Sequence, residues 1–459
     1  MPALAPNATT FASINPLNGE VVGEVPITPA GEVGAVVERA RAAGKAWAAM
    51  TARERAETLK PAAARFAEEQ GRLAELMTRE MGKITREAIS EASYIADSIP
   101  GSVDEMAAAL EPTVLENETC VTTLYRDALG VAACITPWNF PLAMPHSQVL
   151  PALMAGNAVV LKPSEETPLC AQAYADILNE FLPEGVLQVV HGADEQGKAL
   201  TASDVNLIVF TGSREVGKLI HNAASERLIR VILELGGKDP LVVLDGADVE
   251  AAAEYATMNT YRNCGQACIS TERIYLQDGV ADDFMKAFVK KVEALRIGDG
   301  LDEASDVGPM INAHQREHVI GQIDSAVKSG ATIAVGGGDH PDAFVNPTVV
   351  DNVTHAMDIA REETFGPVAT VTRVASVDEA VELANDTPFG LGAVVFGPEK
   401  TAYDVARRID AGMIGVNQSI RGVGGTPWVG AKESGLGFHG SAEGHRQFAQ
   451  VRVVSRPKA

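Results

Sequence analysis

The sequence predicts an α/β protein with parallel sheets covered by helices, and three observations support this fold class. Short apolar runs bounded by Gly, Pro, Asp or Thr alternate with helix-like segments over most of the chain. The chain has 459 residues, of which 46% are hydrophobic, so two or three domains can each bury a core. Two further segments alternate polar and apolar residues or run as short strands, as an exposed β-element does.

The first quarter of the chain is expected to be mostly helical. Residues 31–47 place Val, Ala and Trp side chains near one face and charged side chains off it, which predicts an amphipathic helix. A second helical stretch is predicted over 51–81, because this segment is rich in Ala, Glu, Arg and Leu. A third helix is predicted from 84 to about 110.

Two series of strands follow these helices. The first series has the pattern of dinucleotide-binding folds, in which helices cover a parallel sheet. A second α/β series runs from 241 to about 416. The predicted strands are 131–135, 158–161, 186–190, 207–210 and 231–235 in the first series, and 241–244, 273–276 and 393–396 in the second.

Two strand-like segments fit neither series. Residues 114–129 have the alternation of a β-hairpin, and residues 448–454 form another strand-like run near the carboxyl end. Exposed strands of this kind need a partner, either within the chain or on a neighbouring subunit. We therefore expect an oligomerisation element, and a homodimer or a homotetramer.

The charge of the chain restricts its partners. The formal net charge of −23 disfavours nucleic-acid binding, because such a surface repels phosphate backbones. No run approaches the roughly 20 apolar residues that a membrane-spanning helix needs, so no membrane partner is predicted. The amino terminus shows neither a basic head nor an apolar run, and the expected location is the cytoplasm.

Five cysteines, an odd number, argue for reduced thiols rather than a disulfide framework. The spacing of Cys264 and Cys268 could suggest a metal site, but no nearby His, Asp or second Cys pair completes four ligands. No metal site is therefore predicted. Cys268 lies between glycine-rich turns and a small or polar run, where a thiol can be presented to a substrate; the alternative is a small buried side chain.

Two other polar residues fit chemistry at a thiol. Glu234 follows an apolar strand and precedes two glycines, so it is expected to be partly desolvated and to act as a general base. Asn139, in Thr-Pro-Trp-Asn-Phe-Pro, can donate an amide N–H to a developing negative oxygen. The alternatives are a solvated carboxylate at a strand end and an Asn that holds a turn.

A phosphate-binding turn is predicted at residues 210–217. The segment Phe-Thr-Gly-Ser-Arg-Glu-Val-Gly follows a strand and opens a helix, so the free N–H groups and dipole of the first turn can receive a pyrophosphate. Gly212, Ser213 and Gly217 are the candidate residues. The spacing differs from Gly-x-Gly-x-x-Gly and is weak evidence alone.

These motifs resemble those of the NAD(P)-dependent aldehyde dehydrogenase superfamily, from about residue 14 to residue 454. The similar motifs are Asn-x-Gly-Gln-x-Cys, Leu-Glu-Leu-Gly-Gly-Lys, Pro-Trp-Asn-Phe-Pro and Gly-Ser-x-x-x-Gly. The resemblance implies that Cys268 is the nucleophile, Glu234 the base and Asn139 the oxyanion donor. It also implies a Rossmann-type cofactor domain, an α/β catalytic domain and a β-hairpin oligomerisation element.

The resemblance assigns further residues to a nicotinamide cofactor. Lys162 and Glu165 follow a strand where the family binds the adenosine ribose, and a carboxylate there favours NAD over NADP because it repels a 2′-phosphate. Glu363 is expected to bond the other ribose and Phe365 to pack beside the nicotinamide ring. Trp138 and Leu235 complete the set implied by the match.

Within the superfamily, the chain looks most like the succinate-semialdehyde dehydrogenase group. The resemblance implies that Arg262 grips a substrate carboxylate, for which a guanidinium fork is well shaped; the alternative is a structural arginine. The chain departs from that group where Ser147 replaces a second arginine and where the segment 428–432 replaces Phe-Gly-Gly-x-Lys. Arg421 could restore a cationic pocket, and another aliphatic or aromatic aldehyde stays open as the substrate.

Two histidines fall where many relatives have different residues. Phe438 and His439 stand where Arg and Glu are common, and His439 and His445 are expected to serve subunit contacts. His146 is expected to pack, or to line a substrate tunnel.

The expected boundaries divide the chain into three parts. Residues 1–111 and 130–235 would bind NAD, residues 236–429 would form the catalytic domain, and residues 112–129 and 440–459 would form the oligomerisation element. The expected reaction is oxidation of an aldehyde to the free acid. The rivals are transfer of the acyl group to coenzyme A, which Glu234 argues against, and a non-catalytic protein of the same fold.

Overall fold

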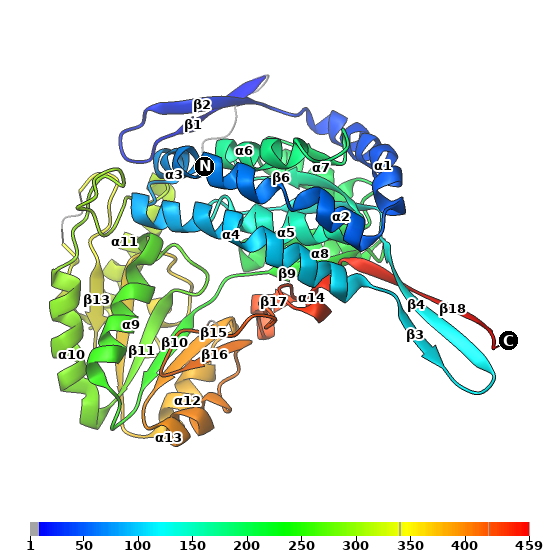
Figure 1. Cartoon of the computed structure of the whole chain (residues 1–459). Helices are drawn as coiled ribbons and strands as arrows, with labels where there is room; N and C mark the ends of the chain where they lie inside the picture. Colours follow the sequence, from blue (N-terminus) through cyan, green and yellow to red (C-terminus); the bar gives the residue numbers. More distant parts are fainter. Residues whose placement is uncertain (1–8, 339–340, 421, 459) are drawn as a thin grey trace.

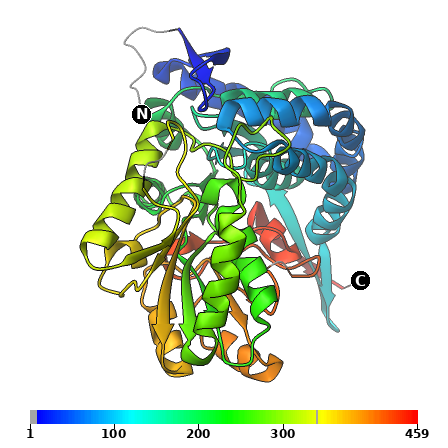
Figure 2. The same ribbon diagram turned by 90° about the vertical axis from the view of Figure 1, so that its left-hand side faces the viewer.

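The computed structural model describes residues 9–338, 341–420 and 422–458 and contains two large, mainly parallel sheets (Figure 1). Helices cover both faces of each sheet, and a three-stranded arm extends away from them (Figures 1 and 2). The predicted α/β class is therefore confirmed. Within the described residues, no helix is both long and apolar enough to cross a bilayer.

The first sheet has six strands in the order β17-β9-β8-β5-β6-β7. All neighbours are parallel except the short edge strand β17, which runs antiparallel to β9. The five strands predicted for this region are confirmed to within one or two residues. Their bounds are β5 Val131–Ile135, β6 Ala158–Lys162, β7 Leu187–Val189, β8 Leu207–Thr211, β9 Arg230–Glu234 and β17 Gly435–Leu436.

Apolar residues on both faces of this sheet are buried by helices, which is why its strands lack polar alternation. On one face of the sheet, alternate strand residues pack against α2–α6 in a hydrophobic core. On the opposite face, the remaining strand residues pack against α1, α7 and α8 in a second core. The bounds are α1 Val33–Ala49, α2 Ala52–Leu59, α3 Ala62–Met81, α4 Thr85–Leu110, α5 Ala143–Met154, α6 Pro168–Asn179, α7 Asp194–Ala202 and α8 Arg214–Ser225.

The second sheet has seven strands in the order β12-β13-β14-β11-β10-β15-β16, of which only β12 is antiparallel to its neighbour. Helices α9–α11 pack on one face, and α12 and α13 on the other. The bounds are β10 Asp239–Val243, β11 Thr271–Gln277, β12 Thr332–Val335, β13 Thr348–Asp351, β14 Val368–Val374, β15 Gly392–Phe396, β16 Met413–Val416, α9 Val249–Tyr261, α10 Asp278–Glu293, α11 Ala313–Lys328, α12 Val377–Asn385 and α13 Glu399–Ala406.

The arm confirms the predicted hairpin and its partner strand. β3 (Thr113–Glu116) and β4 (Cys120–Ala128) are antiparallel, and β18 (Ala449–Pro457) pairs with β4 along its whole length. The helix α14 (Ala442–Gln447) precedes β18 and packs against α4. The arm therefore joins a segment early in the chain to its last strand.

Two predictions for the first quarter need correction. The stretch predicted as one helix over 51–81 is two helices, because Pro61 cannot donate a backbone hydrogen bond and starts α3 instead. A hairpin of β1 (Thr10–Ile14) and β2 (Val21–Pro26) precedes the helices and was not predicted. Short 3₁₀ turns complete the structure: η1 Ala30–Glu32, η2 Arg262–Gly265, η3 Asp358–Ala360 and η4 Lys432–Ser434.

Candidate active site

A cavity of about 1270 Å³ is lined by residues at strand ends and in loops of both large sheets. The ends of β5, β8 and β9 reach it from one side, and the loop before β11 reaches it from the other. This volume exceeds the usual range for one small ligand, so it has room for two. The predicted site residues that line it are Trp138, Asn139, Gly212, Ser213, Leu235, Arg262, Cys268, Glu363 and Phe365.

A strained loop presents Cys268 to the cavity. Asn263, Cys264 and Gly265 have φ values of 52°, 56° and 69°, three consecutive residues in the left-handed region. A Cβ at Gly265 would lie 2.0 Å from the carbonyl oxygen of Gly366, so no larger residue fits. The amide of Asn263 holds the loop by donating to the carbonyls of Asn139, at 2.9 Å, and Gln266, at 3.1 Å. Strain of this kind is typical of a functional site.

The surroundings of Cys268 disfavour its thiolate form. Burial raises its pKa well above the usual range, and the negative charges of Asp239, Glu234 and Glu363 act in the same direction. The reactive form of a cysteine is the thiolate, so the thiol must lose its proton to a base before it can attack a carbonyl.

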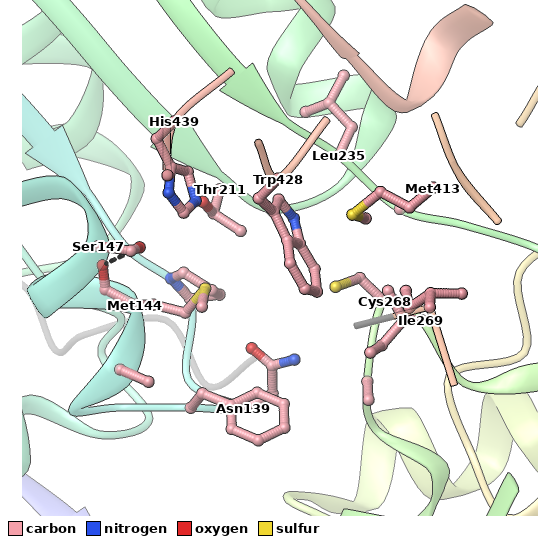
Figure 3. Close-up of a pocket in the computed structure, with 18 of the residues that line it drawn as sticks. Asn139, Met144, Ser147, Thr211, Leu235, Cys268, Ile269, Met413, Trp428 and His439 are labelled. Carbon is pink, nitrogen blue, oxygen red and sulfur yellow. Dashed lines mark hydrogen bonds between the residues drawn. The ribbon is translucent and has the colours of Figure 1, made fainter. Parts of the chain in front are cut away.

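Asn139 lies opposite Cys268, in the loop between β5 and α5. Its side-chain nitrogen donates to the carbonyl of Gln266 at 3.1 Å, which ties it to the Cys268 loop. In Figure 3 the amide points toward the space beside the Cys268 sulfur. A carbonyl oxygen of a substrate bound to the sulfur would lie near this amide.

A buried ion pair fixes the Asn139 loop. Lys83 donates to the carbonyl of Asn139 at 2.9 Å and forms an ion pair with Glu91, and both side chains are fully buried. The other oxygen of Glu91 accepts the N–H groups of Leu142 and Ala143 at the start of α5. Lys83 and Glu91 were not predicted as site residues; both position the loop, and Glu91 also lines the cavity.

Glu234 ends β9 and is buried behind the cavity wall. Its Oε2 accepts a hydrogen bond from Thr211 at 3.3 Å, and its Oε1 lies 2.5 Å from Nε2 of His439. Leu235 and Gly236 line the cavity, but Glu234 is not among the described residues that do. The negative charge of Glu234 still acts on the Cys268 thiol. Glu234, the predicted base, therefore lies near Cys268 but behind the residues that line the cavity.

His439 was missed as a site residue by the sequence analysis. It lines the cavity and contacts Glu234 (Figure 3), and its expected role in subunit contacts stays a prediction. The only signal in the sequence was the departure at 438–439 from the pattern of relatives. His146 and His445 also line the cavity.

The predicted phosphate-binding turn lies between β8 and α8. β8 runs into Gly212 and Ser213, and α8 then begins, with the Ser213 hydroxyl accepting the N–H of Val216 at 3.4 Å. A Cβ on Gly212 would lie 2.4 Å from the Phe210 ring, and one on Gly217 would lie 2.4 Å from the Leu235 side chain. Both glycines therefore keep α8 close to the sheet, with its N-terminus at the cavity.

The opposite wall of the cavity has the residues predicted for a nicotinamide riboside. The rings of Trp138 and Phe365 meet edge to face with centroids 5.5 Å apart. Glu363 Oε1 accepts the N–H of Gly237 at 3.0 Å, and burial, helped by the charge of Glu272, raises the pKa of Glu363 to about 8. These residues fit a nicotinamide dinucleotide.

Lys162 ends β6 and Glu165 follows it at the same edge of the sheet, and neither residue is in the cavity lining. Lys162 donates to the carbonyl of Pro163 at 2.8 Å, and its Nζ lies 3.7 Å from the carboxylate of Glu165. Burial lowers the pKa of Lys162, whereas the charge of Glu165 opposes this shift. The side chain of Glu165 is 20% exposed, so its carboxylate can be reached by a ligand.

Arg262 lies at the substrate end of the cavity, and Arg421 lies outside the described residues. The Arg262 guanidinium lies 5.3 Å from the centre of the Phe140 ring. Within the described part of the chain it has no hydrogen bond and no carboxylate within 4 Å. The Ser147 hydroxyl donates a hydrogen bond to the carbonyl of Met144. Met144, Ile269 and Trp428 give the cavity walls an apolar surface (Figure 3).

Comparison with known proteins identifies the class. Residues 4–454 match the model of the aldehyde dehydrogenase family, and the chain belongs to this family. It is an oxidoreductase that converts an aldehyde to an acid with a nicotinamide cofactor.

Three similar proteins illustrate the relation. A probable succinate-semialdehyde dehydrogenase [NADP(+)] of Sinorhizobium fredii is 38% identical over 99% of this chain and 94% of its own. A glutarate-semialdehyde dehydrogenase of Pseudomonas putida is 37% identical over 98% and 95%. The crystal structure of an NAD-dependent aldehyde dehydrogenase from Sinorhizobium meliloti is 36% identical, covers 98% of this chain and 91% of its own, and has a TM-score of 0.94.

Proposed function

We propose that this enzyme oxidises its aldehyde through a thioester on Cys268, which water then hydrolyses. One observation carries the proposal: the Cys268 thiol and the Asn139 amide face one cavity, and Glu234 lies directly behind its wall. The thiolate attacks the aldehyde carbon, and Asn139 donates to the oxygen that becomes negative. A nicotinamide dinucleotide bound along α8 and Phe365 supplies the hydride acceptor.

Glu234 then acts as the base for hydrolysis. It takes a proton from a water molecule as the water oxygen attacks the thioester carbon, and the C–S bond breaks to release the acid. A base placed for water favours the free acid over transfer of the acyl group to coenzyme A. Incubation with an aldehyde and cofactor, with and without coenzyme A, tests this point: turnover and acid yield should not depend on coenzyme A.

We propose NAD as the preferred cofactor, because the partly exposed Glu165 carboxylate repels a 2′-phosphate. Replacing Glu165 with Ser should weaken NAD use and improve NADP use, shifting the ratio of kcat/KM values by about tenfold, the effect of about 1.4 kcal/mol. Initial rates with both dinucleotides at one fixed aldehyde concentration measure this ratio. An unchanged ratio would remove Glu165 from the cofactor site, and Glu166→Ser serves as the control.

We propose a semialdehyde as the substrate, with its carboxylate bound by Arg262. The guanidinium is half-buried, lies 5.3 Å from the centre of the Phe140 ring and has no carboxylate within 4 Å in the described structure, although the charge of the Glu87 carboxylate acts on it at longer range. A desolvated cation of this kind is stabilised by a bound anion. The relatives named as succinate- and glutarate-semialdehyde dehydrogenases act on such aldehydes and support this choice.

Replacing Arg262 with Met should lower kcat/KM for succinate semialdehyde by about 10- to 100-fold, because a charged hydrogen bond contributes about 1.5–3 kcal/mol. The value for butanal, a neutral chain of equal length, should change little. The Arg262→Lys variant keeps the positive charge but loses the guanidinium fork. Its kcat/KM for succinate semialdehyde should therefore lie between the values for the unmodified enzyme and for Arg262→Met. An equal loss for both aldehydes would show that Arg262 is a structural residue.

A second candidate substrate is a neutral aliphatic or aromatic aldehyde. Ser147 stands where a second arginine would lie, and Met144, Ile269 and Trp428 give the nearby walls an apolar surface (Figure 3). Such walls favour a hydrophobic chain or ring. A higher kcat/KM of the unmodified enzyme for butanal or benzaldehyde than for succinate semialdehyde would favour this candidate.

We further propose that the arm of β3, β4 and β18 joins subunits into a homodimer or homotetramer. Val114, Leu115 and Val453 are 59%, 54% and 60% exposed, an unusual amount for three large apolar side chains on one small sheet. The edges of this sheet also leave backbone groups unpaired within the chain. Sedimentation of the intact protein tests the assembly.

A further inference from the structure

Glu234 and His439 form an isolated pair beside the cavity. Glu234 Oε1 and His439 Nε2 lie 2.5 Å apart, the side chains are 9% and 16% exposed, and neither atom has another polar partner in the described structure. Thr211, which donates to the other carboxylate oxygen, itself accepts from Gln148 at 2.9 Å. Each carboxylate oxygen of Glu234 therefore has one side-chain neighbour, His439 at Oε1 and Thr211 at Oε2.

His439 is the member of the pair that faces the cavity. It lines the cavity, as Leu235 and Gly236 do, whereas Glu234 lies one layer back. Figure 3 shows its imidazole near Thr211, on the same side of the cavity as Met144 and Ser147. Within the described residues, His439 is the titratable side chain in contact with Glu234. A proton on Glu234 can therefore return to the cavity through His439.

Burial alone lowers the pKa of His439, but the charge of Glu234 outweighs this effect and the net pKa is raised. The other titratable groups around His439 are His146 on α5 and His445 on α14, which contacts Glu105 of α4 at 3.7 Å. Burial, helped by the charge of His439, lowers the pKa of both histidines to about 4. Of the three histidines, only His439 has a pKa that is raised above its usual value.

We propose that His439 is the proton outlet of Glu234 during thioester hydrolysis. This inference rests on the proposed role of Glu234. The water oxygen forms a bond to the thioester carbon while its proton moves to Glu234, and the proton then passes from Glu234 to Nε2 of His439, which becomes an imidazolium. The C–S bond breaks, the acid leaves, and the imidazolium returns its proton to the Cys268 thiolate or to water in the cavity. No electrons are exchanged in this step.

Replacing His439 with Ala or Gln tests the outlet. With NAD and the better of two probe aldehydes, succinate semialdehyde or butanal, kcat should fall by about 10- to 100-fold, within the usual range of general acid–base effects. The first turnover of reduced cofactor should stay within about twofold of the unmodified enzyme. The fraction of acylated Cys268 in the steady state, measured by mass spectrometry after acid quench, should rise. Imidazole in the buffer should restore the His439→Ala variant at least about fivefold.

The control is His221→Ala, because His221 is exposed on α8 and outside the cavity. A kcat within twofold of the unmodified enzyme with the same pH profile would overturn the proposal. So would an equal loss of the first turnover and of kcat without imidazole rescue, since that pattern indicates a structural role. The Glu234→Gln variant separates the two claims. If Glu234→Gln hydrolyses the thioester at the normal rate, the proposed role of Glu234 is wrong. If Glu234→Gln is slow and the His439 variants hydrolyse the thioester at the normal rate, only the proposed role of His439 is wrong.

Discussion

Replacing Cys268 with Ser is expected to lower aldehyde oxidation by at least about 10³-fold while cofactor binding stays largely intact. A serine hydroxyl is a far weaker nucleophile than a thiolate and gives an ester, which is a poorer acyl donor than a thioester. The Cys268 side chain lines the cavity but is not part of the predicted cofactor set. Fluorescence titration with NAD and initial rates with the probe aldehydes measure the two properties.

The matched control is Cys120→Ser, on strand β4 of the arm, where the thiol lies 3.7 Å from the hydroxyl of Thr122 and outside the cavity lining. This variant should oxidise aldehydes at the normal rate. Residual activity of Cys268→Ser above a few per cent would remove Cys268 from its assigned role. Loss of NAD binding together with activity would indicate a folding defect, which the melting temperature detects.

Replacing Glu234 with Gln is expected to stop the reaction after one turnover. The amide cannot take a proton from water, so hydrolysis should slow by about 10²- to 10⁴-fold. The first equivalent of reduced cofactor should still form, and acylated enzyme should accumulate. Stopped-flow absorbance of the reduced cofactor at a molar excess of aldehyde shows both effects.

Glu226→Gln, on the exposed end of α8, is the control and should turn over normally. A slow first turnover in Glu234→Gln would show that Glu234 mainly deprotonates the Cys268 thiol, whose high pKa requires a base. Normal steady-state turnover would exclude Glu234 from both roles.

The strands and the motif positions could be predicted because they depend on local sequence. Residues 207–211 form an apolar run that ends at Gly212, and such a run predicts a strand buried on both faces. The structure has this strand, and helices bury both of its faces. The carboxyl ends of parallel strands meet at one edge, which brings Asn139 and Glu234 to one site. The placement of Cys268 opposite them followed from the family resemblance.

Contacts between distant segments could not be predicted in this way. His439 meets Glu234 only because β17 returns beside β9, and neither the pairing nor its register can be seen in a two-residue strand. Lys83, just before α4, contacts Asn139 and pairs with Glu91 of α4. From the local sequence, charged residues of this kind are expected to be solvated, so their burial could not be predicted. The break at Pro61 was visible in the sequence and was missed, since the surrounding residues all favour helix.

The central claim is that the acyl group is carried by the sulfur of Cys268, and peptide mapping of trapped enzyme tests it most directly. Glu234→Gln would be mixed with NAD and succinate semialdehyde or butanal, quenched in acid, digested and analysed by mass spectrometry. We predict one acyl group per chain on the peptide that contains Cys268, formed only when NAD is present. Acylation of another residue, or no acylation after reduced cofactor has formed, would contradict the claim.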